Sequence, residues 1–229
     1  MDRLMKAVTL SYDDGVESDK KLLQILNKYN IRCTFNLNSG IQTHENHWNN
    51  KGFDVARMDP DTLKQLYAGH EIASHGTEHL HPSGMKNKEQ MKAEFFDDAV
   101  ALENMFDKRV QGMAYAFGDY TDEIVDYLKS IGMHYGRTTK STYSFDLQSD
   151  LLRFKPTCHH AEEKLMELAE HFVAMKPDKP QIFYLWGHSY EFDVADNWEI
   201  IENFCKLIAN RDDIFYGTNT EVFEYYNLF

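Results

Sequence analysis

Apolar runs alternate with amphipathic stretches along most of the chain. Short apolar runs predict strands at residues 7–12, 32–37, 71–74, 110–116, 133–138, 181–186 and 214–217. Apolar residues at helical spacing predict helices at 18–29, 60–67, 88–106, 122–131, 161–175, 197–209 and 221–227. Two polar segments, 39–59 and 141–156, have little periodicity and are predicted as long loops, the second with room for a short strand at 151–154.

This order of elements predicts the fold class. Strands that alternate with helices are typical of parallel sheets with helical crossovers. We therefore expect an α/β protein, a distorted (β/α) barrel of about seven parallel strands, with residues 1–229 forming a single catalytic domain. An open doubly wound sheet is the alternative, but no glycine-rich phosphate loop follows the first strand.

Charge and cysteine content narrow the function classes. The formal net charge is -13, with 24 basic and 37 acidic residues. A partner with a phosphate backbone requires a basic surface, so we expect no nucleic-acid partner. The acidity favours neutral or cationic substrates, although it could serve solubility alone. Three sparse cysteines, no signal peptide and no apolar stretch long enough to span a membrane predict a cytoplasmic protein, although an exported mature form would look the same. Nothing indicates the oligomeric state.

Titratable side chains follow several of the predicted strands. In a β/α barrel, reactive groups collect at the carboxyl ends of the strands. The residues at these positions are Asp13, Asp14, His75, His79, Phe117, Arg137, His159, His160 and His188. Because they come from separate strands and meet at one rim, they point to an active site more strongly than any one of them alone.

One part of this set has the composition of a metal site. Asp14 with His75 and His79 offers one carboxylate and two imidazoles, which suits zinc, and cobalt, nickel or manganese would also fit. His81 lies close enough to replace one histidine. Asp13-Asp14-Gly15 could also be no more than a turn. A bound divalent ion would lower the pKa of water and polarise an amide carbonyl.

The strand at 181–186 supplies a candidate acid. His188 follows it and could protonate a leaving amine, because the ordinary pKa of histidine lies near neutrality. Leu185 and Trp186 could wall a small pocket for a methyl group. Tyr12, His159 and His160 are further candidate substrate contacts. A structural role for these side chains is the alternative at each position.

The order and spacing of these residues resemble the polysaccharide deacetylases of carbohydrate esterase family four. Residues 11–15, Ser-Tyr-Asp-Asp-Gly, resemble the family's Thr-Phe-Asp-Asp-Gly, which implies Asp13 as catalytic base and Asp14 as metal ligand. Residues 75–79 resemble His-(Ser/Thr)-x-x-His, with Gly76 where a hydroxyl residue is usual, and imply His75 and His79 as ligands. Residues 185–188 resemble Leu-x-x-His and imply His188 as general acid.

Two family motifs depart from their usual form. Arg-Pro-Pro-Tyr-Gly is here residues 114–118, Ala-Tyr-Ala-Phe-Gly, so Ala114 stands where an arginine normally orients the base. The Phe117 backbone N–H would still help to stabilise an oxyanion. No Asp-x-x-Asp-Trp stretch is present. We predict that Arg137 replaces the missing arginine, the alternative being a solvated side chain or one paired with an acid of 141–156.

The resemblance implies a metal-dependent hydrolase that removes acetyl groups from N-acetylated sugars or oligosaccharides. An O-acetyl ester is a less favoured substrate that the same site would serve. A hydrolase of cyclic amides of the allantoin type is an alternative, as is a carbohydrate-binding relative that has lost the chemistry. The sequence does not name the sugar.

Overall fold

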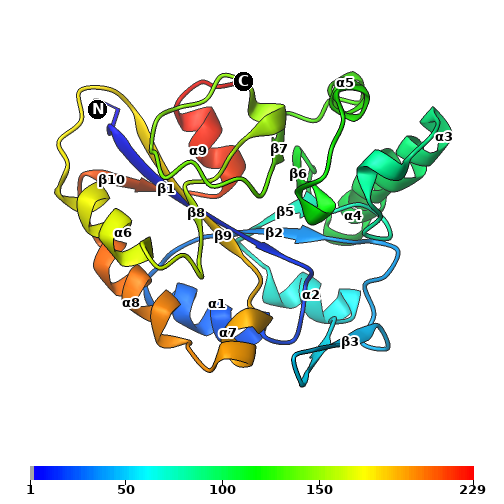
Figure 1. Cartoon of the computed structure of the whole chain (residues 1–229), viewed down its shortest axis with the longest axis horizontal. Helices are drawn as coiled ribbons and strands as arrows, with labels where there is room; N and C mark the ends of the chain where they lie inside the picture. The colour runs from blue at the N-terminus through cyan, green and yellow to red at the C-terminus, as the bar shows by residue number, and fades with distance from the viewer. Residues whose placement is uncertain (1–2) are drawn as a thin grey trace.

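The chain forms a curled sheet of parallel strands covered by helices (Figure 1). The computed structural model describes residues 3–229. Seven parallel strands follow one another in the order β7-β6-β5-β2-β1-β9-β8. Their bounds are β1 Lys6–Asp13, β2 Thr34–Leu37, β5 Glu71–Ser74, β6 Gly112–Ala114, β7 Tyr135–Arg137, β8 Cys158–His159 and β9 Gln181–Gly187. The predicted distorted barrel is confirmed, and the open doubly wound sheet is wrong.

The distortion arises at β1, which shares one of its edges between two strands. β10 (Ile214–Tyr216) pairs with the first half of β1, and β2 pairs with its second half. On the far side of the sheet, residues 154–160, which include β8, connect β7 with β9. The N–H of Phe154 donates to Gly136 in β7 at 2.9 Å, and the N–H of His160 donates to Trp186 in β9 at 2.8 Å. This irregular segment closes the curl where β8 is too short to do so alone.

Helices cover the outer face of the sheet, and one helix fills its inside. Figure 1 shows α1, α6 and α8 along one side of β1 and α9 on the other. The helices are α1 Asp19–Lys28, α2 Pro60–Leu66, α3 Lys88–Met91, α4 Asp97–Phe106, α5 Asp122–Ser130, α6 Leu165–Ala174, α7 Tyr190–Ala195, α8 Glu199–Ile208 and α9 Asn219–Tyr225. Within residues 3–229, no helix has both the length and the apolar character needed to cross a bilayer.

The alternation of side chains along the strands separates two cores. Tyr12 of β1 and Leu185 of β9 pack with the outer helices, whereas Trp186 packs inside the curl with residues of α9. Successive side chains of a strand point to opposite faces, so Asp13 shares the inner face that Tyr12 does not. This alternation decides which residues at the strand ends can face a common site.

The structure changes the prediction in four places. Residues 39–59 are not a plain loop, because β3 (His47–Asn50) and β4 (Phe53–Ala56) form an antiparallel hairpin, which protrudes at the lower right of Figure 1. Its strands are mostly half-buried or exposed. Only Val55 is fully buried, so the apolar face of the hairpin is too small to mark it in the sequence. Residues 151–154 hold the 3-10 turn η4 (Leu151–Arg153) rather than a strand. β8 and α7 were not predicted, since two and six residues are too short for a periodic pattern.

A buried carboxyl group ties the end of β1 to the start of α7. Asp19 accepts hydrogen bonds from the Tyr67 hydroxyl at 2.5 Å, from the Ser189 hydroxyl at 2.5 Å and from the N–H of Val16 at 3.1 Å. Burial raises the pKa of Asp19 from 3.8 to about 7, although these hydrogen bonds oppose the rise. At pH values between these two, the folded chain retains a proton on Asp19 that the unfolded chain has released.

Asp19→Asn should change how stability depends on pH. Between pH 4 and 7 the folded wild type binds a proton that the unfolded chain does not, so this group's contribution to the free energy of unfolding falls as pH rises. Asparagine does not titrate, so the variant does not show this decrease in the free energy of unfolding as pH rises. The difference in unfolding free energy, wild type minus variant, should therefore decrease by several kcal/mol from pH 4 to pH 7 in urea titrations. A difference that stays constant over this range would contradict the assignment.

Candidate active site

A cavity opens at the carboxyl ends of β1, β5 and β9. Its volume is about 480 Å³. Its titratable lining residues include Asp13, Asp14, His75, His79 and His188, and its aromatic ones are Trp48, Tyr115, Phe117, Trp186 and Tyr190. Strand ends that are far apart in the sequence thus bring most of the predicted site residues to one place.

Asp14, His75 and His79 form a group that could hold a metal ion. One potential ligand atom from each lies within 4.8 Å of the others. Nδ1 of His75 lies 2.8 Å from the Ala114 carbonyl oxygen, which can only accept, so Nδ1 carries the hydrogen and the Nε2 lone pair remains for a cation. Burial lowers the pKa of His79 to about 4, so that ring is neutral at pH 7.

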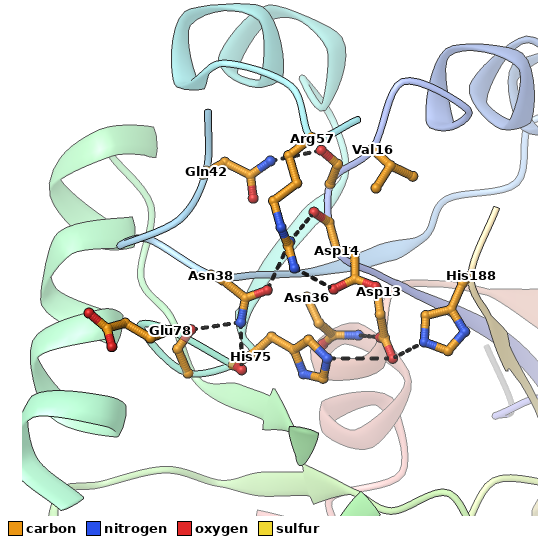
Figure 2. A network of polar contacts seen from close by, with 12 residues as sticks. Asp13, Asp14, Val16, Asn36, Asn38, Gln42, Arg57, His75, Glu78 and His188 are labelled. Atoms are coloured by element: carbon orange, nitrogen blue, oxygen red, sulfur yellow. Dashed lines mark hydrogen bonds and ion pairs between the residues drawn. The ribbon is translucent and has the colours of Figure 1, made fainter. Parts of the chain in front are cut away.

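Asp14 is held as an anion by Arg57. Nη2 of Arg57 donates to Oδ1 of Asp14 at 2.9 Å, and Nη1 donates to the Asp14 backbone carbonyl at 2.5 Å (Figure 2). Burial opposes ionisation of Asp14, but the charge of Arg57 and the neighbouring histidines outweigh it and lower the pKa to about 2. A deprotonated carboxylate with two imidazole nitrogens fits a divalent cation.

The loop that carries His79 needs unusual backbone angles. Asp14 and His79 both have positive φ, at 84° and 56°. Gly76 has a φ of +83°, and a Cβ there would come within 2.3 Å of Oε1 of Glu94. Glu94 lies in the π-helical turn η2 (Lys92–Phe96), and its Oε1 accepts a hydrogen bond from the N–H of Leu80 at 3.0 Å. These contacts explain why glycine replaces the usual hydroxyl residue at position 76.

Asp13 lies at the centre of the buried polar network (Figure 2). Its Oδ1 accepts a hydrogen bond from Nδ2 of Asn36 at 2.7 Å, and its Oδ2 accepts one from Nη2 of Arg137. Nε2 of His188 lies 3.7 Å from Oδ2 of Asp13. Burial opposes ionisation of Asp13, but Arg137 and the histidines outweigh it and hold the pKa below its usual range. The predicted contact between Arg137 and Asp13 is therefore present, and its catalytic role stays a prediction.

His188 lies between two carboxylates. Its Nε2 faces Asp13, and its Nδ1 lies 3.4 Å from Oε1 of Glu191. Burial opposes protonation of the ring, but the contact with Glu191 and the charge of Asp13 raise the pKa of His188 to about 9. The ring is an imidazolium at neutral pH and has a proton to give.

The family follows from the comparison with protein-family models. The model described as polysaccharide deacetylase matches residues 2–136. The chain belongs to the polysaccharide deacetylase family. The comparison with curated protein sequences gives no match.

Solved structures of polysaccharide deacetylases share the fold of this family member. A putative polysaccharide deacetylase from Mycobacterium smegmatis gives a TM-score of 0.69 at 18% identity, covering 98% of this chain and 91% of the other. The Xyl-CE4 domain of a multidomain xylanase from the hindgut metagenome of Trinervitermes trinervoides gives 0.60 at 16% identity, covering 97% and 91%. BA3943, a CE4 family pseudoenzyme from Bacillus anthracis, gives 0.55 at 15% identity, covering 95% and 65%. Identities this low show the fold alone, and a fold does not by itself imply activity.

Four of the predicted substrate contacts lie outside the cavity lining. Tyr12 and Leu185 are fully buried on the outer face of the sheet, because they alternate with the inward-facing Asp13 and Trp186. We therefore correct both to core residues. His159 and His160 face Glu191 instead of the cavity, at 3.1 and 2.9 Å.

Sequence reasoning missed several residues that contact the site. Arg57 and Trp48 come from the hairpin region that had been predicted as a loop, and Tyr190 begins α7. Asn36 is the last residue but one of β2, one position beyond the buried Phe35, and its place near a strand end is a signal that could have identified it. Glu191 follows His188 by three residues, and a histidine with a nearby acid is a further signal.

Proposed function

We propose that residues 1–229 form one catalytic domain that hydrolyses acetyl groups on N-acetylated sugars or oligosaccharides with the help of one divalent cation. The observation that carries this proposal is the arrangement of Asp13 and His188 beside the group Asp14, His75 and His79 in a single cavity. Zinc is the first choice for the cation, and cobalt, nickel or manganese would fit the same ligands. An O-acetyl ester is the second choice of substrate.

Asp13 would activate water beside the divalent cation that Asp14, His75 and His79 would hold. A divalent cation on Asp14, His75 and His79 would lower the pKa of water and polarise the acetyl carbonyl. Asp13, ionised at neutral pH, accepts a proton from the attacking water as oxygen adds to the acetyl carbon. Arg137 and Asn36 hold one carboxylate oxygen each, so Asp13 cannot rotate away from the water.

His188 and Phe117 serve the second half of the reaction. As the bond between carbonyl carbon and nitrogen breaks, the amine nitrogen takes the proton from Nε2 of His188, and acetate and the free amine result. The Phe117 backbone N–H is our candidate donor to the oxyanion. Trp186, on the inner face of the sheet near the carboxyl end of β9, would line the space for the acetyl methyl group.

The outer cavity suits a sugar ring. Trp48, Phe117 and Tyr190 line it with aromatic surface, and Phe117 is 55% exposed. Carbohydrate rings have apolar faces that pack on aromatic side chains, and polar edges that the charged groups can bind. These walls support a sugar rather than a small cyclic amide as the substrate.

His188→Ala should keep the cation and lose most of its turnover. General acid catalysis is worth about 10²–10⁴-fold, and the loss should be greater for amides than for esters, because an amine is the poorer leaving group. Acetate release from an N-acetylglucosamine oligomer and from acetylated xylan would be compared at saturating zinc. Wild-type rates on the N-acetyl substrate in this variant would rule out the general-acid role.

The same assay tests the function itself. The wild-type chain with zinc should release acetate from the N-acetylglucosamine oligomer faster than from acetylated xylan, and a chelator should stop the reaction. Binding of the oligomer without acetate release at any metal concentration would support the carbohydrate-binding alternative instead. Hydrolysis of allantoin with no acetate release would support the cyclic-amide alternative.

A further inference from the structure

Glu191 contacts three histidines at once. It lies in the first turn of α7, three residues after His188, so its carboxylate returns over that ring. Oε1 lies 3.4 Å from Nδ1 of His188. Oε2 lies 2.9 Å from Nε2 of His160 and 3.1 Å from Nε2 of His159. Both oxygens of one carboxylate are therefore in contact with imidazole nitrogens.

The spacing of His159, His160 and Glu191 is also compatible with a metal ion. The hydrogen bonds of the two histidines decide whether their Nε2 atoms could bind a cation or instead carry hydrogen. The N–H of Ala161 donates to Nδ1 of His159 at 3.1 Å. Since a backbone N–H can only donate, Nδ1 has no hydrogen, and the hydrogen of the neutral ring is on Nε2. Nε2 of His159 then has no lone pair for a cation, and it lies within contact distance of Oε2 of Glu191.

His160 is held in the same tautomer. Its Nδ1 lies 3.2 Å from the Tyr12 hydroxyl, and its Nε2 faces Glu191. Burial lowers the pKa of His160 to about 4, so the ring is neutral. Burial opposes ionisation of Glu191, but the three histidines outweigh it and hold the pKa well below its usual range. An ionised carboxylate can only accept, so the hydrogen of His160 is on Nε2.

We propose that Glu191, in contact with His159 and His160, is a positioning residue that keeps a hydrogen on Nδ1 of His188 and leaves Nε2 as the atom that gives its proton to the leaving group. This inference rests on the proposed function. When Nε2 of His188 releases its proton, the amine nitrogen gains it together with the electron pair of the broken carbon–nitrogen bond. Nδ1 keeps its hydrogen towards Glu191, and the neutral ring returns to the charged form by taking one proton from solvent.

Other charged groups around His188 favour the same orientation. Asp13 faces Nε2 at 3.7 Å, with Asp14 next to it in the chain, and the His159 ring lies 6.2 Å from the His188 ring between centroids. Asp13 attracts the Nε2 proton from the cavity side. Among these groups, Glu191 has the carboxylate oxygen that lies near Nδ1, and without it the ring could turn or change its tautomer.

The first test is the tautomer of His188 in the zinc-loaded wild-type protein. A long-range ¹H–¹⁵N NMR spectrum reports which ring nitrogen carries hydrogen, and the spectrum of His188→Gln assigns the signal. Above the pKa of the ring, we expect hydrogen on Nδ1. Hydrogen on Nε2 would overturn the inference, whether or not the chain releases acetate, so this outcome is distinct from failure of the proposed function.

The second test is Glu191→Gln, with the exposed Glu163→Gln as the matched control. In Glu191→Gln, kcat on the N-acetylglucosamine oligomer should fall by about 10²-fold, and the descending limb of its pH profile should move to lower pH. KM should stay near the wild-type value, and zinc should stay at one equivalent. Glu163→Gln should match the wild type in kcat, in the pH profile, in KM and in zinc content.

Two further variants keep the test decisive. Glu191→Asp restores the charge and should recover part of kcat. His159→Gln removes one of the two imidazole rings that contact Oε2 of Glu191 and should lower kcat less than Glu191→Gln, without loss of zinc. The inference would be overturned in favour of a second metal site if the wild-type protein bound two zinc ions and Glu191→Gln and His159→Gln each bound only one. Wild-type kcat in Glu191→Gln would also overturn it.

Discussion

Replacing both His75 and His79 with alanine should remove the bound divalent cation and lower turnover by about 10³-fold or more. In the proposed site the two rings would supply two of the three ligands, and Asp14 alone, already paired with Arg57, would hold a cation weakly. Lewis-acid activation is worth several kcal/mol, and each 1.4 kcal/mol is about tenfold in rate. Metal content by elemental analysis and acetate release would be measured on the same samples.

His81→Ala is the matched control for this prediction. His81 was the sequence-level alternative ligand, but its side chain is 65% exposed and its ring stacks on Phe117 at 3.8 Å between centroids. It lies outside the group of Asp14, His75 and His79. His81→Ala should keep a full equivalent of metal. Full metal occupancy in the double variant would show that the cation, if any, binds elsewhere.

Arg137→Met should destabilise the fold and also lower turnover. The side chains of Arg137 and Asp13 are 1% and 2% exposed, so the ion pair is buried. Removing one partner of such a pair leaves an uncompensated charge and costs about 3–5 kcal/mol of unfolding free energy. Asp13 would also lose the group that fixes one of its oxygens, and turnover should fall by about 10²-fold. Urea titration and acetate release measure the two effects.

Arg137→Lys separates charge from geometry. Lysine keeps the positive charge but cannot reproduce the planar guanidinium, which also lies 4.2 Å over the Trp186 ring. It should retain most of the stability, have reduced turnover and bind the cation with nearly wild-type affinity. The exposed Arg109, which precedes β6, gives a control in Arg109→Met that should match the wild type. Unchanged turnover in Arg137→Met would show that Asp13 needs no such partner.

Several features of the site could be read from local sequence. Asp13 and Asp14 follow the apolar β1, His75 follows β5 and His188 follows β9. Strand ends of parallel strands meet at one edge, so these residues could be placed together without coordinates. The contact between Arg137 and Asp13 was the least direct of these predictions, because it required that β7 end at the same rim as β1.

Two neighbouring residues of β9 show what the local sequence could not predict, namely which face of the strand points into the cavity. Leu185 and Trp186 are both apolar and adjacent, yet only Trp186 reaches the cavity. The sequence carries no sign of which face is inner, because the buried strand is apolar on both sides. That assignment depends on where α9 packs, and α9 lies more than thirty residues further along the chain.

What the sequence by itself determined is the alternation of strands and helices, and hence the barrel, together with the candidate ligands, base and acid at the strand ends. Only the tertiary structure decided their partners. Arg57 reaches Asp14 from the end of a hairpin. His159 and His160 reach Glu191 from the last residue of the two-residue strand β8 and from the residue that follows it. The physical reason is that periodicity records which residues are buried against their own neighbours in the chain. Contacts between polar side chains of distant segments depend instead on how the sheet curls and on the register of its strands, and neither leaves a periodic signal.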